Sequence, residues 1–295
     1  MLAVWAEEDE FAGGSLSELI DGIVAMPSGE GGPEWSGRDA PATFVTTSPD
    51  WWGGERTFGG MVVAQALSAA SQTVPRDLDV HSLHGYFLRP SKPGTPSTHR
   101  VERLRDGRSF STREVVSEVE GRETFRLACS FHRAEAGDEY QLPMADDVPY
   151  PDALATGGSP SDAPPPTPSP FDVHDLRSTE QRQDGTYLST RRCWFRTRQR
   201  LSDDPTIHAC VLAYLSDMTG AAFRPLSLNS WSGYTDASLD HAVWFHRRRR
   251  ADEWNLFDFQ ALLNASGRST IRGTMYGEDG VLYLSMAQEL LIRKL

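Results

Sequence analysis

The sequence predicts an α+β protein made of two tandem copies of one unit, each with a central helix wrapped by an antiparallel β-sheet. Three pairs of similar segments occur along the 295 residues in the same order. The offset within the pairs stays between 157 and 160 residues, which is longer than a solenoid period and fits a duplicated domain. The pairs are HSLHGYFLRP from His81 with SLDHAVWFHR from Ser238, GRSF from Gly107 with GRST from Gly267, and LACSF from Leu127 with MAQEL from Met286.

A helix opens the first copy, which we place at residues 44–133. The helix is entered through the FGG motif, is rich in small residues, and stops at Pro75, because proline lacks the N–H that a helix interior needs. Small side chains let a sheet approach such a helix closely. Two alternating segments, RSFSTREVVSEV from Arg108 and TFRLACSFH from Thr124, then form strands joined by a turn at residues 120–121.

The second copy, at residues 187–295, repeats this order. VLAYLSDMTGAA from Val211 supplies the helix, and alternating strands follow as FDFQALLNAS from Phe257, STIRGTMYG from Ser269 and VLYLSMAQELLIR from Val281. In each copy one apolar helix is followed by an antiparallel meander that must cover it. That arrangement, made twice, is a double hotdog.

Two other segments differ in composition from the copies. Residues 1–43 form an acidic, Gly-rich N-terminal extension, which we expect to be partly disordered, with a possible short helix at residues 15–20. Residues 134–186 contain the stretch ATGGSPSDAPPPTPSP. Because this stretch has no apolar periodicity, we expect a Pro-rich linker between the two copies.

The bulk composition excludes several classes of protein. A net charge of -12 argues against a nucleic-acid partner, and the one basic run, residues 247–250, is either a local anion site or a solvated turn. No stretch approaches the roughly 18 apolar residues of a membrane span, and no signal segment is evident. The cysteines, Cys129, Cys193 and Cys210, lack CxxC spacing and suit the core of a protein in a reducing compartment. We therefore expect a soluble, cytoplasmic protein.

Other kinds of chemical site have weak support in the sequence. No GxSxG elbow, GxGxxG motif or P-loop occurs. Four histidines, His81, His84, His241 and His246, lie in predicted strands, but no acidic or cysteine ligands accompany them at a recognised spacing. We expect neither a metal nor a cofactor.

Several consecutive motifs resemble a known family. FGGMVVAQAL, VHSLHGYFLRP, VERLRDGRSFSTREV, DHAVWFHR and the C-terminal AQELLIR look like the acyl-CoA thioesterase II family of double-hotdog enzymes. The resemblance covers roughly residues 44–133 and 187–293. It implies hydrolysis of fatty acyl-CoA to free fatty acid and CoA by a homo-oligomer of double hotdogs. It also places the family's catalytic residues on Asp217, Ser238 and Gln288.

The residues themselves give an independent interpretation of Asp217. Its spacing from Cys210, Ala213 and Tyr214 puts a carboxylate on a helix face that is otherwise small or apolar. A buried carboxylate without donors costs several kcal/mol, so the fold should supply donors or water, and Ser238 and Gln288 are suitable. The alternative is that Asp217 caps a turn or lies exposed near the helix end.

Gln288 is a polar residue on the otherwise apolar face of the last strand. Such amides are usually structural hydrogen-bonding groups. However, the matching position in the first copy holds Cys129, so this place in the sheet does not demand an amide. Aligning the copies also matches Asp217 with Ser68 and Ser238 with His81. Ser238 alone is equally compatible with an ordinary turn or cap residue.

These residues lead to a mechanistic hypothesis. Asp217, hydrogen-bonded by Ser238 and Gln288, would orient a water and accept its proton as the water attacks the thioester carbonyl. The backbone at Gly59 and Gly60 would help to bind substrate, and a helix N-terminus would stabilise the oxyanion. His81 would line the substrate-binding site. The alternative is a noncatalytic acyl-CoA-binding or lipid-binding protein in which the same polar groups form a fixed core network.

Overall fold

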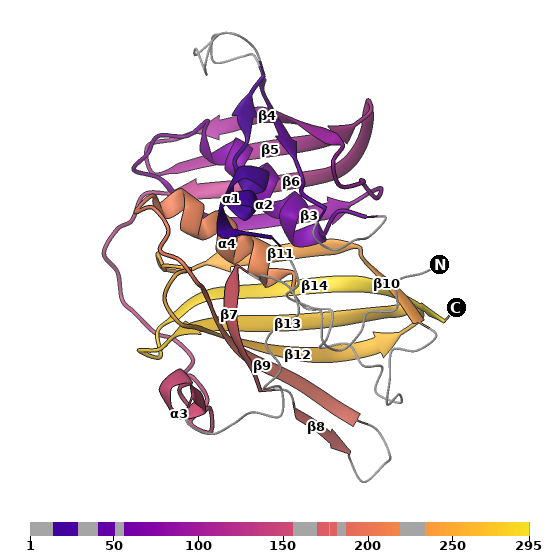
Figure 1. The fold of residues 1–295 in the computed structure, drawn as a ribbon. Helices are drawn as coiled ribbons and strands as arrows, with labels where there is room; N and C mark the ends of the chain where they lie inside the picture. Colours follow the sequence, from indigo (N-terminus) through magenta and orange to yellow (C-terminus); the bar gives the residue numbers. More distant parts are fainter. Residues whose placement is uncertain are drawn as a thin grey trace.

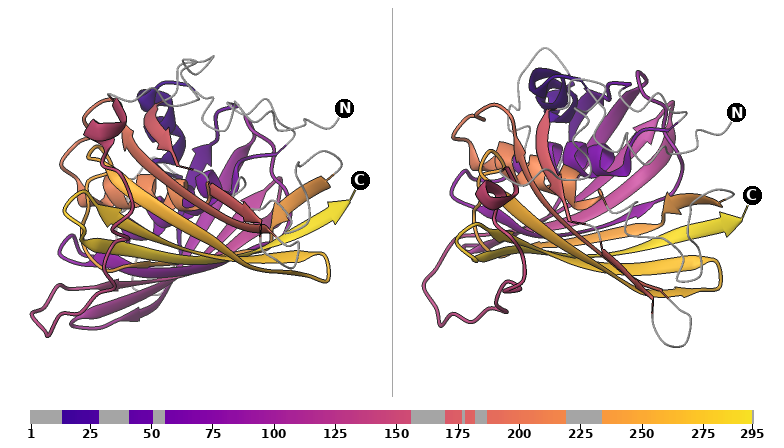
Figure 2. Two further views of the ribbon diagram at one scale, coloured as in Figure 1. Left: turned by 90° about the horizontal axis from the view of Figure 1, so that it is seen from below. Right: turned by 60° about the horizontal axis from the view of Figure 1, so that its bottom comes forward.

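The computed structural model describes residues 14–28, 41–50, 56–155, 170–176, 178–181, 187–218 and 234–294. The first residues of the extension and the Pro-rich stretch itself, 156–169, lie outside this part of the chain. Within it, one antiparallel sheet of 14 strands carries helices α2 and α4 on its concave face (Figure 1 and Figure 2).

The first half supplies six strands and two helices to this architecture. They are α1 (Leu16–Ile23), β1 (Met26–Pro27), β2 (Ala42–Thr47), α2 (Gly59–Ser71), β3 (Asp79–Phe87), β4 (Pro96–Asp106), β5 (Phe110–Val119) and β6 (Arg122–His132). The predicted helix is confirmed, and so is the predicted turn between β5 and β6. Glu120 and Gly121 both have positive φ, at 52° and 72°. A two-residue hairpin turn needs this left-handed conformation at both residues, because only then does its twist match that of the flanking strands.

The second half repeats the helix followed by a meander and adds further strands. The elements are α3 (Pro151–Ala155), β7 (Phe171–Asp175), β8 (Ser178–Gln181), β9 (Tyr187–Thr197), α4 (Pro205–Ser216), β10 (Tyr234–Ser238), β11 (Asp240–Phe245), β12 (Asn255–Ala265), β13 (Arg268–Gly277) and β14 (Leu282–Lys294). Helix α4 begins where the Asp204 carboxylate accepts from the Thr206 N–H at 2.9 Å, with Pro205 in its first turn.

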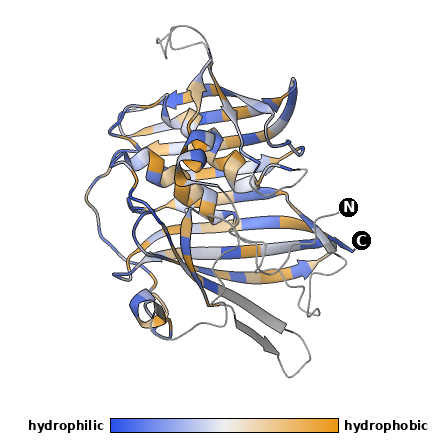
Figure 3. Cartoon of the chain, in the orientation of Figure 1, coloured by the Kyte–Doolittle hydropathy of each residue, from blue (hydrophilic) through white to orange (hydrophobic). Residues whose placement is uncertain are grey.

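The two halves share the sheet through one pair of strands. The strand order is β1-β2-β4-β5-β6-β3-β11-β14-β13-β12-β9-β7, with β10 paired to β14 and β8 to β9. Strands β3 and β11 pair antiparallel, with His241 opposite Gly85 and Val243 opposite Leu83. Hydrophobic and hydrophilic residues alternate along many of the strands, so that one face of the sheet is apolar (Figure 3). The concave face therefore forms one continuous surface across both halves.

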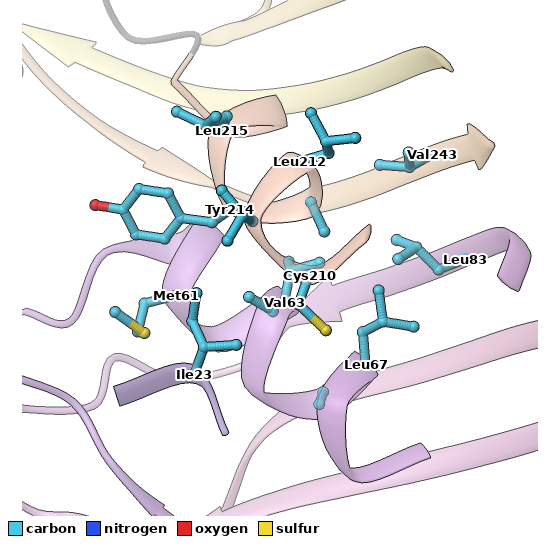
Figure 4. Packing of buried hydrophobic residues seen from close by; sticks show 14 of the residues in the cluster. Ile23, Met61, Val63, Leu67, Leu83, Cys210, Leu212, Tyr214, Leu215 and Val243 are labelled. Carbon is cyan, nitrogen blue, oxygen red and sulfur yellow. The ribbon is translucent and has the colours of Figure 1, made fainter. Parts of the chain in front are cut away.

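Helices α2 and α4 pack against each other on this surface. The main core draws on both helices, on α1 and on the seam strands β3 and β11, including Val63, Leu67, Leu83, Leu212 and Val243 (Figure 4). The start of α2 approaches the end of α4 closely. A Cβ at Gly60 would overlap the Tyr214 carbonyl oxygen, so a glycine there lets the two helix ends meet.

Parts of the expected extension and linker are ordered by packing. Ser15 and Glu18 form a capping box that starts α1, and Leu19 and Ile23 on this helix are fully buried in the core. On the convex side of the second half, the chain before α3 covers a small cluster around Trp194, whose indole N–H donates to the Pro149 carbonyl. Strands β7 and β8, which also lie within residues 134–186, pair with β9.

Candidate active site

Asp217 lies where the C-terminus of α4 meets the N-terminus of α2. It is the residue that caps α4, and only 5% of its surface is exposed. The Gly60 N–H donates a hydrogen bond to its carboxylate. A Cβ on Gly59 would come within 2.5 Å of Asp217 Oδ2, so a glycine there leaves room for the carboxylate. The partial positive charge at the start of α2 favours the ionised form of Asp217.

The sequence-predicted partners of Asp217 meet it in space. Gln288 Nε2, from β14, donates to Asp217 Oδ1 at 2.5 Å and to Ser238 Oγ at 2.9 Å. The Ser238 hydroxyl, at the end of β10, donates to the same Oδ1 at 3.4 Å. The structure thus brings together an acid, an amide and a hydroxyl that are separated by up to 71 residues in the chain.

Burial sets the protonation of Asp217. It raises the pKa of this carboxyl from its ordinary 3.8 to about 7, against the opposing hydrogen bonds from Gln288, the Gly60 N–H and Ser238. The nearby charge of Asp236 acts in the same direction as burial, and Arg56 in turn lies close enough to interact with Asp236. A carboxyl with a pKa near 7 can both hold and release a proton at neutral pH, which is what a general base requires.

The sequence did not reveal that His241 belongs to this group. In the register of β11 and β14 Ala242 lies opposite Ala287, so His241 and Gln288 are the neighbouring residues on the two strands and both are buried. His241 is only 1% exposed, and its Nε2 lies 2.7 Å from the Ser216 hydroxyl at the end of α4. Burial lowers the pKa of this ring to about 3, so it is neutral. In the sequence, His241 looked like one of several strand histidines.

The first half has different residues at the equivalent places. Cys129 lies opposite Leu83 on β3, and burial raises the pKa of its thiol to about 12, so it carries no nucleophilic thiolate. The Ser68 hydroxyl accepts a hydrogen bond from the Ala25 N–H at 3.1 Å and ties α2 to the segment after α1. The polar groups of the site therefore come from the second half and from the start of α2.

Pairing in the sheet revises one correspondence between the copies. Phe131 on β6 and Leu290 on β14 occupy equivalent places in the two halves. Val80 lies opposite Phe131, and Ser238 lies opposite Leu290. The register of β3 shifts by a bulge between residues 80 and 82. Consequently Val80, and not His81, is the counterpart of Ser238.

His81 itself lies away from Asp217. Its ring contacts the rings of Phe110 and His132, with centroid separations of 5.6 and 6.1 Å. Phe110 and His132 alternate with buried neighbours along β5 and β6, so they face the convex side of the sheet. The structure therefore brings the two glycines of α2 to the carboxylate but not His81.

The basic run at residues 247–250 is engaged within the chain. Arg247 pairs with Glu139, Arg248 with Asp79, Arg249 with Glu253, and Arg250 with Asp203 and Asp252. Of the two expectations for this run, an anion site and a solvated turn, internal ion pairing leaves less reason for an anion site.

Two features of the described residues bear on the class of the site. No group of three or more His, Cys, Asp or Glu side chains in the ordered part of the chain is arranged to hold a metal ion. No described helix is both long enough and apolar enough to cross a bilayer.

Comparison with known proteins identifies the family. The model of the acyl-CoA thioesterase N-terminal domain matches residues 48–132, and that of the C-terminal domain matches residues 145–292. Human acyl-coenzyme A thioesterase 8 is 34% identical over 275 residues, which cover 82% of each chain. This chain belongs to the acyl-CoA thioesterase family, and the resemblance expected from its motifs is confirmed.

Solved structures agree with this assignment. The acyl-CoA thioesterase II TesB2 of Mycobacterium marinum is 35% identical, with a TM-score of 0.69 over 86% of this chain and 92% of that one. A protein of Alicyclobacillus acidocaldarius described as having a hot dog fold shares 19% identity, with a TM-score of 0.71 over 94% and 98% of the two chains. At that identity the second likeness concerns the fold alone.

Proposed function

We propose that this chain hydrolyses fatty acyl-CoA thioesters to free fatty acid and CoA. The observation that carries the proposal is the buried carboxylate of Asp217, bonded by Gln288 and Ser238 beside the start of α2. Membership of the acyl-CoA thioesterase family supports the choice of substrate class, since the human relative is named as an acyl-CoA thioesterase.

In the proposed reaction Asp217 is the general base. Ionised Asp217 orients a water and accepts one of its protons while the water oxygen bonds to the thioester carbonyl carbon. The tetrahedral intermediate then collapses, the carbon–sulfur bond breaks, and the leaving CoA sulfur takes up the proton that Asp217 holds, which restores the ionised base. Gln288 and Ser238 hold Oδ1 in place, and in this proposal Oδ2 accepts the proton of the water.

The first turn of α2 is our choice for stabilising the oxyanion. N–H groups at a helix start lack intrahelical acceptors and carry partial positive charge. Gly60 uses its N–H on Asp217, whereas the Met61 and Val62 N–H groups donate to the Phe58 carbonyl. We therefore assign the Gly59 N–H, next to Oδ2, to the developing oxyanion.

Thiol release tests the proposal directly. Purified protein is incubated with acyl-CoAs of several chain lengths, and free CoA is followed with a chromogenic disulfide. We expect release that grows linearly with enzyme concentration for at least part of the series. Tight binding without release for every chain length would instead identify the noncatalytic acyl-CoA-binding protein.

The finer architecture is part of the same proposal. Each half supplies a helix and a meander, which supports a double hotdog with domains at residues 44–133 and 187–295. We also propose a cytoplasmic homo-oligomer. Light scattering coupled to size-exclusion chromatography tests the association, and a monomeric mass at micromolar concentration would refute it.

A further inference from the structure

We infer that Asn264 and Ser269 form a polar subsite beside the catalytic groups, which binds a neutral amide or hydroxyl of the thioester substrate. Both polar atoms of the Asn264 side chain, Oδ1 and Nδ2, are shielded from solvent, and so is the Ser269 hydroxyl. Within the part of the chain that the structure describes, these atoms have no hydrogen-bond partner. Buried polar groups are almost always paired, because an unpaired one loses the free energy of its hydration. This pair therefore calls for a partner from outside the chain.

The register of the sheet puts the pair on one line with a side chain of the site. Ser238 on β10 lies opposite Leu290 on β14, and Leu290 lies opposite Ser269 on β13. Ser269 in turn lies opposite Asn264 on β12. Residues directly opposite each other in a sheet point to the same face, and Leu290 belongs to the main core on the concave face. The unpaired polar atoms thus lie on the same face of the sheet as Ser238.

The distance from the reacting groups suits a part of the substrate other than the thioester itself. Gln288 lies opposite Ile271, so Ser269 is one strand across from Gln288 and two residues along. With strands about 4.8 Å apart and about 3.4 Å per residue, the Cα atoms of Ser269 and Asn264 lie about 8 and 12 Å from that of Gln288. The pantetheine arm of CoA carries amides at such distances from the thioester, and an acyl chain can carry a hydroxyl there. Both groups donate and accept, as the side chains of the pair do.

The first half shows what an internal partner at this place looks like. Ser111 lies opposite Phe131, and Asp106 lies opposite Ser111, so Asp106 and Ser111 are the equivalent pair. The guanidinium of Arg113, which lies opposite Cys129, donates from Nη2 to Asp106 Oδ1 at 2.5 Å. The polar side chain at the place of Asn264 is therefore satisfied by the chain itself.

An isoleucine replaces this arginine in the second half. Ile271, opposite Gln288, holds the place of Arg113. An aliphatic side chain offers no hydrogen-bond donor or acceptor, so it leaves Asn264 for a ligand to satisfy. What the first half satisfies with its own guanidinium, the second half leaves unpaired next to the catalytic groups.

Two substitutions and a matched control separate ligand binding from structure. Asn264→Leu and Ser269→Ala remove the polar atoms with little change in size, and Ser111→Ala makes the equivalent change in the first half. The inference rests on the proposed function for its substrate class, so binding is measured without turnover. Calorimetry follows the binding of S-decyl-CoA, a thioether that cannot be hydrolysed, and of S-(ω-hydroxydecyl)-CoA.

We expect Asn264→Leu to raise Kd about tenfold and Ser269→Ala to raise it by a smaller factor. The melting temperature of the free protein should stay equal or rise in both, because an apolar group replaces an unpaired polar one. Ser111→Ala should leave Kd unchanged. A higher Kd for both ligands assigns the subsite to the pantetheine arm, and a higher Kd for the hydroxylated ligand alone assigns it to the acyl chain.

Unchanged Kd values for both ligands in the two folded variants would overturn the inference, and so would an equal rise in Ser111→Ala. Higher Kd values with a lower melting temperature would overturn it too, because they would show that the pair holds the fold. Thiol release from decanoyl-CoA is a separate readout. Its absence from wild-type protein that binds S-decyl-CoA would refute the proposed function and leave the subsite standing.

Discussion

The two halves of this molecule share a fold but place different residues opposite each other at one rung of the sheet. The first half has Leu83 opposite Cys129, and in the second half His241 and Gln288 adjoin the facing pair Ala242 and Ala287. The apolar pair packs without any requirement for hydrogen bonds. The polar pair is held because Asp217 and Ser216, at the end of α4, supply partners. After duplication, the first copy packs with apolar residues at this place, and the second copy carries the polar side chains of the site.

The helices differ in a complementary way. Helix α4 contributes a side chain, Asp217, from its C-terminus, where the helix dipole disfavours a carboxylate. Helix α2 contributes its N-terminus, where the dipole and the Gly60 N–H favour one. Neither half contains the whole site, so the close approach of the two helix ends is what assembles it.

Exchanging the residues that distinguish the halves should have a large effect. We expect Gln288→Cys, which copies the first-half residue, to lower kcat about 100- to 1,000-fold, because Asp217 loses a charge-assisted donor. Thiol release under saturating acyl-CoA measures this. The reciprocal substitution Cys129→Gln is the matched control, because it changes the equivalent position of the sheet in the first half. If this variant folds, its kcat should stay within a few-fold of the wild-type value. Equal losses in both variants would contradict the placement of the catalytic side chains in the second half.

The contact between the helix ends can be tested at Gly59. Gly59→Ala adds a Cβ that would come within 2.5 Å of Asp217 Oδ2 and 3.1 Å of Phe87. We expect kcat to fall about 100-fold, because the carboxylate must move from the start of α2. Gly137→Ala, where nothing lies within 4 Å of the added Cβ, is the control. Full activity in folded Gly59→Ala would show that α2 is not part of the site.

The pH dependence sharpens the role of Asp217. Because its pKa is raised to about 7, kcat/KM should fall about tenfold per pH unit below pH 7 and level off above it. The folded pKa lies above the ordinary 3.8, so the folded state binds this proton more tightly than the unfolded state does. This carboxyl therefore contributes stability at low pH that is lost as the pH rises from about 4 to about 7. A flat rate profile between pH 5 and 8 would contradict the assignment.

The smallest expected effect concerns the first half. Ser68→Ala removes the acceptor of the buried Ala25 N–H. We expect a loss of about 1 to 3 kcal/mol in the free energy of unfolding with kcat unchanged. Urea denaturation and thiol release measure the two quantities. A kcat loss without destabilisation would give this residue a part in catalysis after all.

Much of this organisation could be predicted from the sequence, because it depends on residues that lie close together in the chain. The repeat, the Ala-rich helix after the FGG motif and the turn at Glu120 and Gly121 depend on short-range patterns. The meeting of Asp217, Ser238 and Gln288 was predictable because the family motifs fix it and because Cys129 showed that Gln288 was not required by the sheet.

The remaining features depend on long-range register, which a sequence pattern does not contain. The burial of His241 next to the site becomes apparent only once β11 is set against β14. The bulge in β3 moves His81 away from the place expected for it. The packing of α1 needs the completed core, because its apolar face is short and finds its partners on distant elements.

The most direct measurement is the activity and stability of Asp217→Asn in one preparation. We predict that thiol release from acyl-CoA falls at least about 1,000-fold. We also predict that the melting temperature at pH 8 is equal to or higher than that of the wild-type protein, because the substitution removes a buried charge. A folded variant with wild-type turnover would contradict the account.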